Sequence, residues 1–540
     1  MTRTLVLLAV LASATIVLAQ DWQNVRLNND ATTQLQNEQQ VVVNPADPSN
    51  LVAAWRDFRL GYRQVGWGYT RDHGATWTNP GLFVDPYYPR DSDPALTVNA
   101  QGDFFAMLLA YTGDTNQPNG MLMYRSTDGG VTWEDRGFAV DGVPGVFEDK
   151  EFIACDRTDS FFRGRIYMAW ARFYDADIYC VTTADEGATW SDEVLVSDSS
   201  GNPFPPPAVG PDGTLYVAWT NFGSSSIKID RSFGGLAFGT DLTVTQVWNP
   251  DPTLNGNIPS PAHPALDVDI SGGAHNGRLY IAYMSREGSN DYDIFIRHSD
   301  DQGQTWSASR RINDDAFNNG RDQFHVWLTV DNLGTVTVVW LDRRQDPSNL
   351  AWHCYLSQST DGGLTWSANQ QVSTAPSHPS DVAVPTAADG PRVPHPDEAD
   401  TRAGVIGEYI GIACWDGYAT PIWVDTRNGD QDTYGGFQAL TAVPDDPAQT
   451  VVRLRVGPNP AGGQTALRYE VPADGPVTLA LYDIKGRRIR TAVDRNLRRG
   501  AYEFVWDTTD QAGRRVPTGT YLARLRTGAG EELRAVTVTR

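Results

Sequence analysis

Three short segments of the chain share the pattern Trp-x-Asp-x-Arg, and arginines in and around them are candidates for binding an anion. The segments are Trp55–Arg59, Trp340–Arg344 and Trp423–Arg427. A guanidinium group is a planar fork that matches a carboxylate, so several such groups around one pocket could hold an acidic ligand. The candidate arginines are Arg59, Arg321, Arg343 and Arg427. The recurrence fits equally well a structural Asp–Arg pair that stabilises each repeat, and the sequence leaves both interpretations open.

Acidic side chains precede several of the predicted strands and could perform acid–base chemistry. Asp93, Glu151 and Glu408 each lie just before or at the start of an apolar run. Two carboxylates that flank a glycosidic bond are the usual machinery of sugar hydrolysis, so this set is compatible with a hydrolase of neutral glycans. The same residues could also line a surface that binds a glycan or a protein without cleaving it.

A repeated turn positions these residues. The pattern Ser/Thr-x-Asp-x-Gly-x-Thr-Trp occurs five times, with aspartates at Asp72, Asp128, Asp185, Asp301 and Asp361. Successive spacings are 56, 57, 116 and 60 residues, and a decayed copy at residues 232–235 fills the double gap. Glycine permits a tight backbone, while the aspartate and the hydroxyl can accept hydrogen bonds from backbone N–H groups. We therefore expect these five aspartates to be structural.

The runs around each turn predict four strands per repeat. Each repeat is about sixty residues long. Two strand-like runs precede the turn, a further run opens most of the repeats, and a fourth run follows the turn. Such a repeat predicts an all-β protein built as a β-propeller, with seven blades and six as the alternative. The last unit is one strand short, and residues 24–27 could complete it. This closure would hide the sheet edges.

The two ends of the chain predict export and a second domain. Residues 1–19 read as a signal peptide, with Arg3 followed by an apolar run and a small-residue cleavage site. Residues 20–440 would form the propeller, 441–452 a linker and 453–540 a small Ig-like β-sandwich. The formal net charge is −23. The segment from residue 451 onward contains 16 basic and 9 acidic residues, whereas the preceding part contains 27 basic and 57 acidic residues. This asymmetry supports two domains, and the acidic body argues against nucleic acid as a partner.

The repeated turn is identified as the Asp box, or bacterial neuraminidase repeat, and residues 20–440 resemble the sialidase-like propellers. In that family three arginines hold the substrate carboxylate, and a tyrosine with a glutamate partner is the nucleophile. The resemblance implies Tyr409 as nucleophile, Glu151 as its partner and Asp93 as acid/base, with the four candidate arginines as the clamp. The Arg-Ile-Pro motif of the family is absent here, so Arg59 or Arg90 would have to replace it.

The C-terminal region is similar to the Ig-like domain of FlgD and to sorting modules of exported bacterial proteins. The resemblance is carried by residues 458–460, 481–487, 506–507 and 517–521. It implies that this domain engages a secretion or cell-surface attachment machinery.

Together these observations predict a monomeric bacterial protein that is secreted or held at the cell surface and engages carbohydrate or a glycoconjugate. Its site would be the funnel at the end of the propeller away from the Asp boxes. The first hypothesis is an exo-glycosidase of sialidase type, and the alternative is a non-catalytic glycan- or protein-binding module. No cofactor is expected, although the oxygen-rich segment 425–432 leaves calcium open. The four cysteines fit buried apolar positions better than disulfides.

Overall fold

The computed structural model describes residues 22–112, 118–173, 177–381, 406–438 and 453–539, except 458, 460, 472–473, 484, 486, 499 and 529. The predicted signal peptide and linker lie outside these ranges. The chain divides into two compact units, residues 1–439 and 440–540. The described residues contain strands and one short 3-10 helix, Pro379–Asp381, so the all-β class is confirmed. Among them, no helix has the length and apolar character needed to cross a bilayer.

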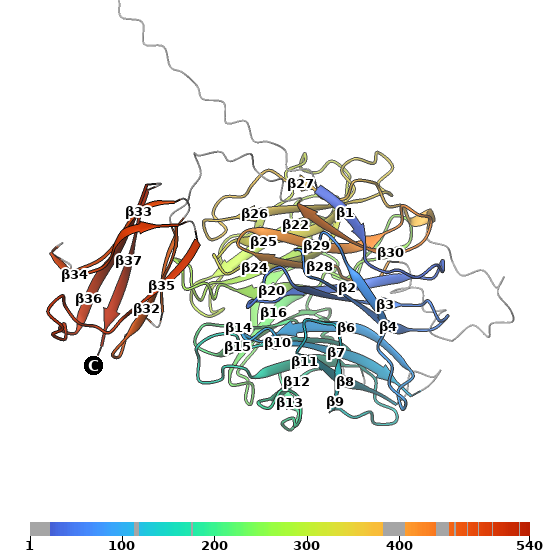
Figure 1. Cartoon of the computed structure of the whole chain (residues 1–540). Coiled ribbons are helices and arrows are strands. Elements are labelled where there is room, and N and C mark those ends of the chain that lie inside the picture. The colour runs from blue at the N-terminus through green and yellow to red at the C-terminus, as the bar shows by residue number, and fades with distance from the viewer. Residues whose placement is uncertain are drawn as a thin grey trace, which may run out of the picture. The chain divides into compact units, whose positions relative to one another are not determined.

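Seven four-stranded antiparallel sheets make up most of the described part of the first unit (Figure 1). In chain order six of them contain β2 (Gln36–Val43), β3 (Leu51–Asp57), β4 (Gln64–Thr70) and β5 (Thr78–Leu82); β6 (Arg90–Val98), β7 (Phe104–Tyr111), β8 (Asn119–Ser126) and β9 (Glu134–Val140); β10 (Glu148–Cys155), β11 (Ile166–Arg172), β12 (Asp177–Thr183) and β13 (Val194–Leu195); β14 (Pro207–Val209), β15 (Thr214–Asn221), β16 (Ser226–Phe233) and β17 (Leu242–Gln246); β20 (Ala265–Val268), β21 (Leu279–Ser285), β22 (Asp293–Ser299) and β23 (Arg310–Arg311); β24 (Gln323–Val330), β25 (Val336–Asp342), β26 (His353–Ser359) and β27 (Gln370–Gln371). The seventh contains β28 (Gly411–Trp415), β29 (Tyr418–Asp425), β30 (Asp432–Gln438) and β1 (Trp22–Arg26). A small hairpin, β18 (Thr253–Leu254) and β19 (Ile258–Pro259), lies between two sheets in the sequence.

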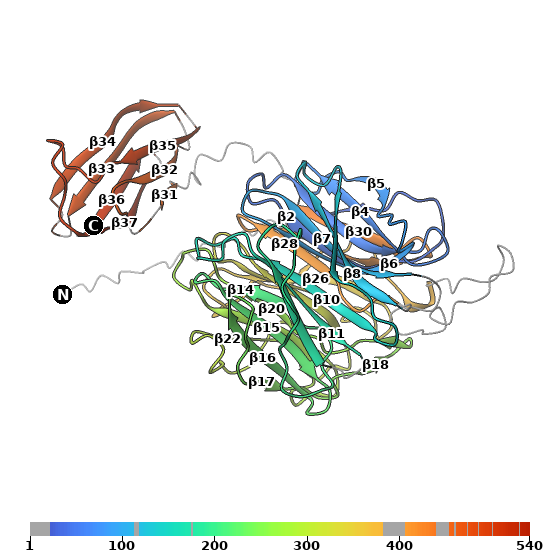
Figure 2. The ribbon, with the colours of Figure 1, turned by 90° about the horizontal axis from the view of Figure 1, so that it is seen from below.

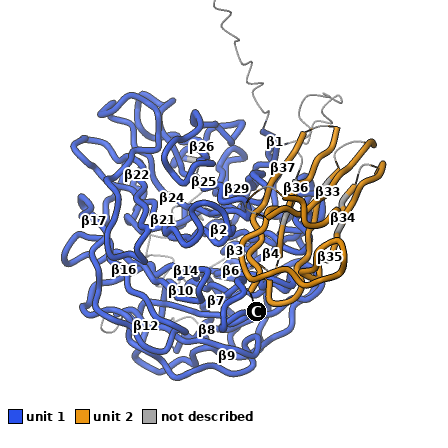
Figure 3. Tube along the Cα trace, turned by 90° about the vertical axis from the view of Figure 1, so that its left-hand side faces the viewer, with its two compact units in different colours: residues 1–439 blue, residues 440–540 orange. Residues whose placement is uncertain are grey.

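The seven sheets form a closed ring. The first strand of each sheet contacts the first strand of the next, in the order β2, β6, β10, β14, β20, β24 and β28, and β28 contacts β2. Figure 3 shows these strands around a common centre, and Figure 2 shows the sheets of the same unit from another side. The N-terminal strand β1 pairs with β30, with Val25 opposite Gly435. The prediction that residues near the N-terminus complete the last sheet is therefore confirmed.

The second strand of each sheet lies between two neighbouring sheets, and its sequence shows why. Every residue of β7 is buried, as is every residue of β3, β21 and β25. Strands covered on both faces read as continuous apolar runs without alternation. A fully buried tryptophan recurs at equivalent positions, namely Trp55, Trp170, Trp219, Trp340 and Trp423.

The Asp-box turns join the third and fourth strands of their sheets, as predicted. In the first turn, Asp72 accepts hydrogen bonds from the backbone N–H and the hydroxyl of Thr76, at 2.9 and 2.7 Å. Thr70 Oγ1 donates to Asp72 and accepts from the Gly74 N–H, and the Trp77 indole donates to the Gly74 carbonyl. These bonds hold the pKa of Asp72 below its usual value despite partial burial, which on its own would raise it. The turn is complete within itself, which supports a structural role.

The second unit contains two antiparallel sheets that share one core. One sheet has β31 (Arg453–Gly457), β32 (Thr465–Val471) and β35 (Gly500–Trp506); the other has β33 (Gly475–Asp483), β34 (Arg488–Leu497), β36 (Gly519–Thr527) and β37 (Gly530–Val538). Leu467 and Trp506 from the first sheet and Leu479, Leu525 and Val536 from the second belong to the same buried cluster. Two sheets packed face to face over such a core form a sandwich.

Candidate functional site

The first strands of the seven sheets are the innermost strands of the ring, and four of them contain a β-bulge near their first residues. Each bulge changes the direction in which an ionisable side chain points. The pairing register shifts within β2, β6, β10 and β24. Inside these shifts Glu38, Asp93, Lys150 and His325 have φ values of 57°, 47°, 58° and 49°. Bulges of this kind redirect side chains and are frequent beside active sites. Here they occur at the same end of the ring, away from the Asp-box turns.

Lys150 is the centre of the resulting charge cluster. Its Nζ lies 3.0 Å from Asp93 Oδ2 and 2.6 Å from Glu408 Oε2. Burial alone would lower the pKa of Lys150, but the carboxylates of Asp149 and Asp93 outweigh it and raise that pKa. Burial would likewise raise the pKa of Asp93, but Lys150 and then Arg56 reverse the effect and hold it low. The ammonium and the Asp93 carboxylate therefore stabilise each other's charged forms.

Three neighbouring carboxyl groups, those of Glu151, Asp149 and Glu38, have raised pKa values instead. Burial, and then the charge of Asp93, raises the pKa of Glu151 well above its usual value. Neither carboxyl oxygen of Glu151 accepts a hydrogen bond from another described residue. Burial raises the pKa of Asp149 to about 7, and it also raises that of Glu38, whose carboxylate lies 3.3 Å from Arg56. Carboxyl groups with pKa values pushed apart in one site are the pattern expected of an acid and its ionised partner.

Aromatic rings border the cluster. Phe152, Phe204 and Tyr409 form a buried group against which Trp327 packs. The rings of Phe152 and Trp327 are stacked with centroids 5.5 Å apart, and the Tyr409 ring meets Phe152 edge-on at 5.8 Å. Burial raises the pKa of Tyr409 well above its usual value, and the carboxylate of Asp93 adds to this. The phenol is therefore held in its neutral form.

The structure brings the three predicted catalytic residues together. Asp93, Glu151 and Tyr409 all belong to this cluster: the charge of Asp93 raises the pKa of both Glu151 and Tyr409. All three are less than 5% exposed. Their proximity follows from the ring, because β6, β10 and β28 all begin at the same end.

The arginine that ends each Trp-x-Asp-x-Arg motif pairs with the aspartate of its own motif, which favours the structural interpretation over anion binding. Arg59 makes a two-pronged ion pair with Asp57, with contacts of 3.0 and 2.7 Å. Arg427 does the same with Asp425, at 2.8 and 2.7 Å. In the third copy the partner of Asp342 is Arg344. The tryptophan indole of each motif also donates to its aspartate, at 2.8–2.9 Å.

The two remaining candidate arginines have other surroundings. Arg343 is fully buried, donates to the Asn255 carbonyl at 2.8 Å and lies 3.6 Å from Asp322. Its guanidinium stacks over the Phe324 ring at 4.9 Å, and burial lowers its pKa to about 10. Arg321 donates to the Gly320 carbonyl at the surface. Because Arg59, Arg343 and Arg427 already have partners, the structural interpretation of the motif is the one that the geometry favours.

In the oxygen-rich segment 425–432, Asp425 and Asp432 are engaged in hydrogen bonds and ion pairs. Asp432 accepts from the Asn28 amide at 2.9 Å and pairs with Arg26 at 2.7 Å. Asp425 is bound by Trp423 and Arg427. Within the described ranges, no group of three or more His, Cys, Asp or Glu side chains is arranged to hold a metal ion.

Comparisons with known proteins agree with the repeat pattern. Residues 297–308 match the BNR/Asp-box repeat family and residues 445–530 match the FlgD Ig-like domain family. The chain carries a BNR/Asp-box repeat and an FlgD Ig-like domain. A sialidase from Micromonospora viridifaciens is 25% identical over 234 residues, which cover 42% of this chain and only 30% of that sialidase.

Solved structures resemble the Asp-box unit at low identity. A leech intramolecular trans-sialidase is 14% identical with a TM-score of 0.42, covering 59% of this chain and 67% of its own. An α-L-arabinofuranosidase from Fusarium graminearum is 13% identical with a TM-score of 0.44, covering 62% of this chain and 97% of its own.

Sequence reasoning missed the central role of Lys150 and of Arg56 in this Asp-box protein. Both residues were visible in charged segments, Lys150 between Asp149 and Glu151 and Arg56 beside Asp57. Lys150 is brought into the cluster by a bulge in β10 that was not predicted from the sequence. A lone cation inside an acidic segment was the available signal.

Proposed function

We propose that the Asp-box unit is a seven-bladed, carbohydrate-active propeller that hydrolyses a glycosidic bond at the Lys150 cluster. The observation that carries the proposal is the pair of carboxyl groups with opposed pKa shifts. Glu151 is buried without a hydrogen-bonding partner among the described residues, while Asp93 is held ionised by Lys150. Such a pair supplies a proton donor and a charged carboxylate at neutral pH.

The same electrostatics suggest how the roles are divided. Glu151 is the better general acid, because its raised pKa keeps it protonated. Asp93 is the better stabiliser of positive charge that develops on the sugar ring, because Lys150 keeps it ionised. Tyr409 would orient the substrate from the aromatic border, since its raised pKa makes it a poor nucleophile.

This division favours a neutral glycan over a sialoside. A sialoside needs cations for its carboxylate, and three of the four candidate arginines pair with aspartates. Lys150 is itself neutralised by Asp93 and Glu408. An anionic substrate would therefore meet a site whose carboxyl groups outnumber its free cations.

A non-catalytic binding module is the second candidate, and burial is the observation that favours it. Lys150, Asp93, Glu151 and Glu408 are each less than 10% exposed. A charge cluster so enclosed can stabilise the centre of the ring without touching a ligand, in which case glycan or protein binding would use another surface.

The test is turnover by the purified full chain of fluorogenic glycosides, with neutral furanosides and pyranosides in one set and a sialoside in the other. Glu151→Gln should lower kcat for the neutral substrate at least about 100-fold, the range expected for loss of a general acid. Glu134→Gln, which changes an exposed glutamate paired with Arg136, is the matched control and should leave kcat unchanged. Absence of turnover on every glycoside would favour the binding module. Turnover of the sialoside alone, lost in Tyr409→Phe, would restore the sialidase hypothesis.

The remaining proposals concern the setting of the protein. We propose that residues 1–19 direct export, that 20–440 form the propeller, and that 441–452 link it to the FlgD-like domain at 453–540. That domain would hold the protein at the bacterial surface or pass it to a secretion machinery. Detection of the protein in culture medium or on intact cells, with and without residues 453–540, tests this assignment.

A further inference from the structure

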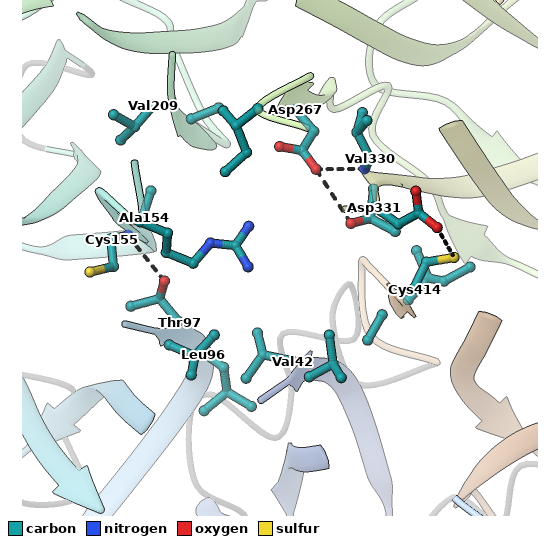
Figure 4. A pocket seen from close by; sticks show the side chains of 18 of the residues that line it. Val42, Leu96, Thr97, Ala154, Cys155, Val209, Asp267, Val330, Asp331 and Cys414 are labelled. Carbon is teal, nitrogen blue, oxygen red and sulfur yellow. Dashed lines mark hydrogen bonds between the residues drawn. The ribbon is translucent and has the colours of Figure 1, made fainter. Parts of the chain in front are cut away.

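A cavity of about 380 Å³ lies at the opposite end of the innermost strands from the Lys150 cluster (Figure 4). All seven innermost strands line it with their C-terminal parts, together with the turns that lead to the second strands. The cavity therefore lies on the Asp-box side of the ring, whereas the sequence predicted a funnel on the other side. Its volume is in the range of small-molecule sites, which run from about 300 to 1,000 Å³.

Most of the side chains that line this cavity are apolar. Figure 4 shows Val42, Leu96, Ala154, Val209 and Val330 around its open centre. They come from five different strands, and the side chains of Asp267, Asp331 and Cys414 lie around the same centre. The labelled polar groups are largely engaged: Thr97 accepts from the Cys155 N–H, and Asp331 from the Gly417 N–H.

Three charged side chains also line the cavity, and one of them, Asp331, is already bound by the Gly417 N–H. Arg157, in the turn after β10, has no hydrogen bond or ion pair within the described part of the chain, although it is half-buried. Asp267, on β20, accepts from the Val330 and Val268 N–H groups, both at 2.8 Å. Arg157 is close enough to influence the Asp267 carboxylate, yet the two do not form an ion pair. A cation and an anion thus face one apolar space without neutralising each other directly.

We propose that this cavity binds a short peptide with free ends and apolar side chains. The terminal carboxylate would pair with the guanidinium fork of Arg157 and the terminal ammonium with Asp267. The ends of an extended dipeptide are about 7 Å apart, at roughly 3.3–3.6 Å per residue. This span suits two charges that lie beyond ion-pair distance. The apolar walls would cover the side chains, and each leucine-sized group buried would contribute to affinity. The proposal is independent of the glycosidase proposal, because the two sites lie at opposite ends of the ring.

Isothermal titration of the full chain with dileucine tests the proposal. We expect saturable binding, weakened at least about 10-fold when the ligand is N-acetyl-dileucine, dileucine amide or diglycine. The first two compounds remove one end charge each, and the third removes the apolar side chains. Absence of dileucine binding at millimolar concentration, or equal binding of all four compounds, would overturn the proposal.

Variants assign the two charges. Arg157→Met and Asp267→Asn should each weaken dileucine binding at least about 10-fold. Arg163→Met, which removes an exposed arginine paired with Asp159, is the matched control and should bind as the wild type does. If Asp267→Asn fails to fold, Arg157→Met still tests the assignment. Arg157 forms no hydrogen bond or ion pair within the described chain, so its replacement breaks no such contact. Unchanged binding by Arg157→Met would refute the assignment.

Discussion

Replacing Lys150 with methionine should destabilise the protein in a pH-dependent way. The change removes the cation that lies 3.0 Å from Asp93 and 2.6 Å from Glu408, both buried. Breaking a buried ion pair by removing one partner costs about 3–5 kcal/mol, because the other charge is left uncompensated. Methionine keeps most of the volume of the side chain, so loss of packing contributes little.

The size of the thermal shift follows from the size of the unfolding unit. An entropy of unfolding of about 2.1 cal/mol/K per residue, over roughly 400 residues, makes 1 kcal/mol equal to about 1.2 °C. The midpoint of thermal unfolding should therefore fall by about 4–6 °C at neutral pH. Lys228→Met is the control: its ammonium bonds the Thr243 hydroxyl at the surface, and the midpoint should stay within about 1 °C.

The loss of stability in Lys150→Met should depend on pH in a defined direction. In the wild type the pKa of Asp93 is lowered, so its ion pair contributes stability above the unfolded carboxyl pKa and loses it as the pH falls through the folded value. Without Lys150, burial would raise the pKa of Asp93, and protonation would relieve the penalty. The difference between variant and wild type should therefore shrink from about pH 7.5 to about pH 5. Calorimetry that shows no loss at neutral pH, or a difference that grows on acidification, would refute the reasoning.

Two further predictions concern the architecture. Asp425→Asn removes the buried carboxylate that binds the Trp423 indole and Arg427; the thermal midpoint should fall by about 3–4 °C, and glycosidase turnover, if present, should persist in the folded fraction. A midpoint equal to that of the wild type would mean that the motif is not structural. Deletion of residues 22–27 removes the strand that pairs with β30 and should expose a sheet edge. Light scattering should then show aggregation well below the wild-type midpoint, and a monodisperse, equally stable variant would contradict closure by this strand.

The structure could be predicted best from the sequence where the interacting residues are close together in the chain. An Asp-box turn contains its donors and acceptors within eight residues, so Asp72 and Thr76 could be assigned from the pattern alone. The motif Trp-x-Asp-x-Arg is equally local, and yet its role was ambiguous. The motif has the same sequence whether its arginine is free to bind a ligand or is paired with its aspartate. Only the observed contact between Arg427 and Asp425 distinguishes the two possibilities.

The sequence by itself determined the repeat and the order of strands around each turn, because these depend on side chains a few residues apart. It pointed to the closing strand only because the last repeat lacked one, since that strand pairs with residues about 400 positions away, with Val25 opposite Gly435. Only the tertiary structure decided which charges meet. Lys150 reaches Asp93 and Glu408 from a different sheet through a bulge, and Arg157 shares a cavity with Asp267 on another strand. The pKa of each group depends on what covers it and which charge lies opposite, and both are set by the ring. For that reason the candidate catalytic residues could be named from the sequence, but their division of roles could not.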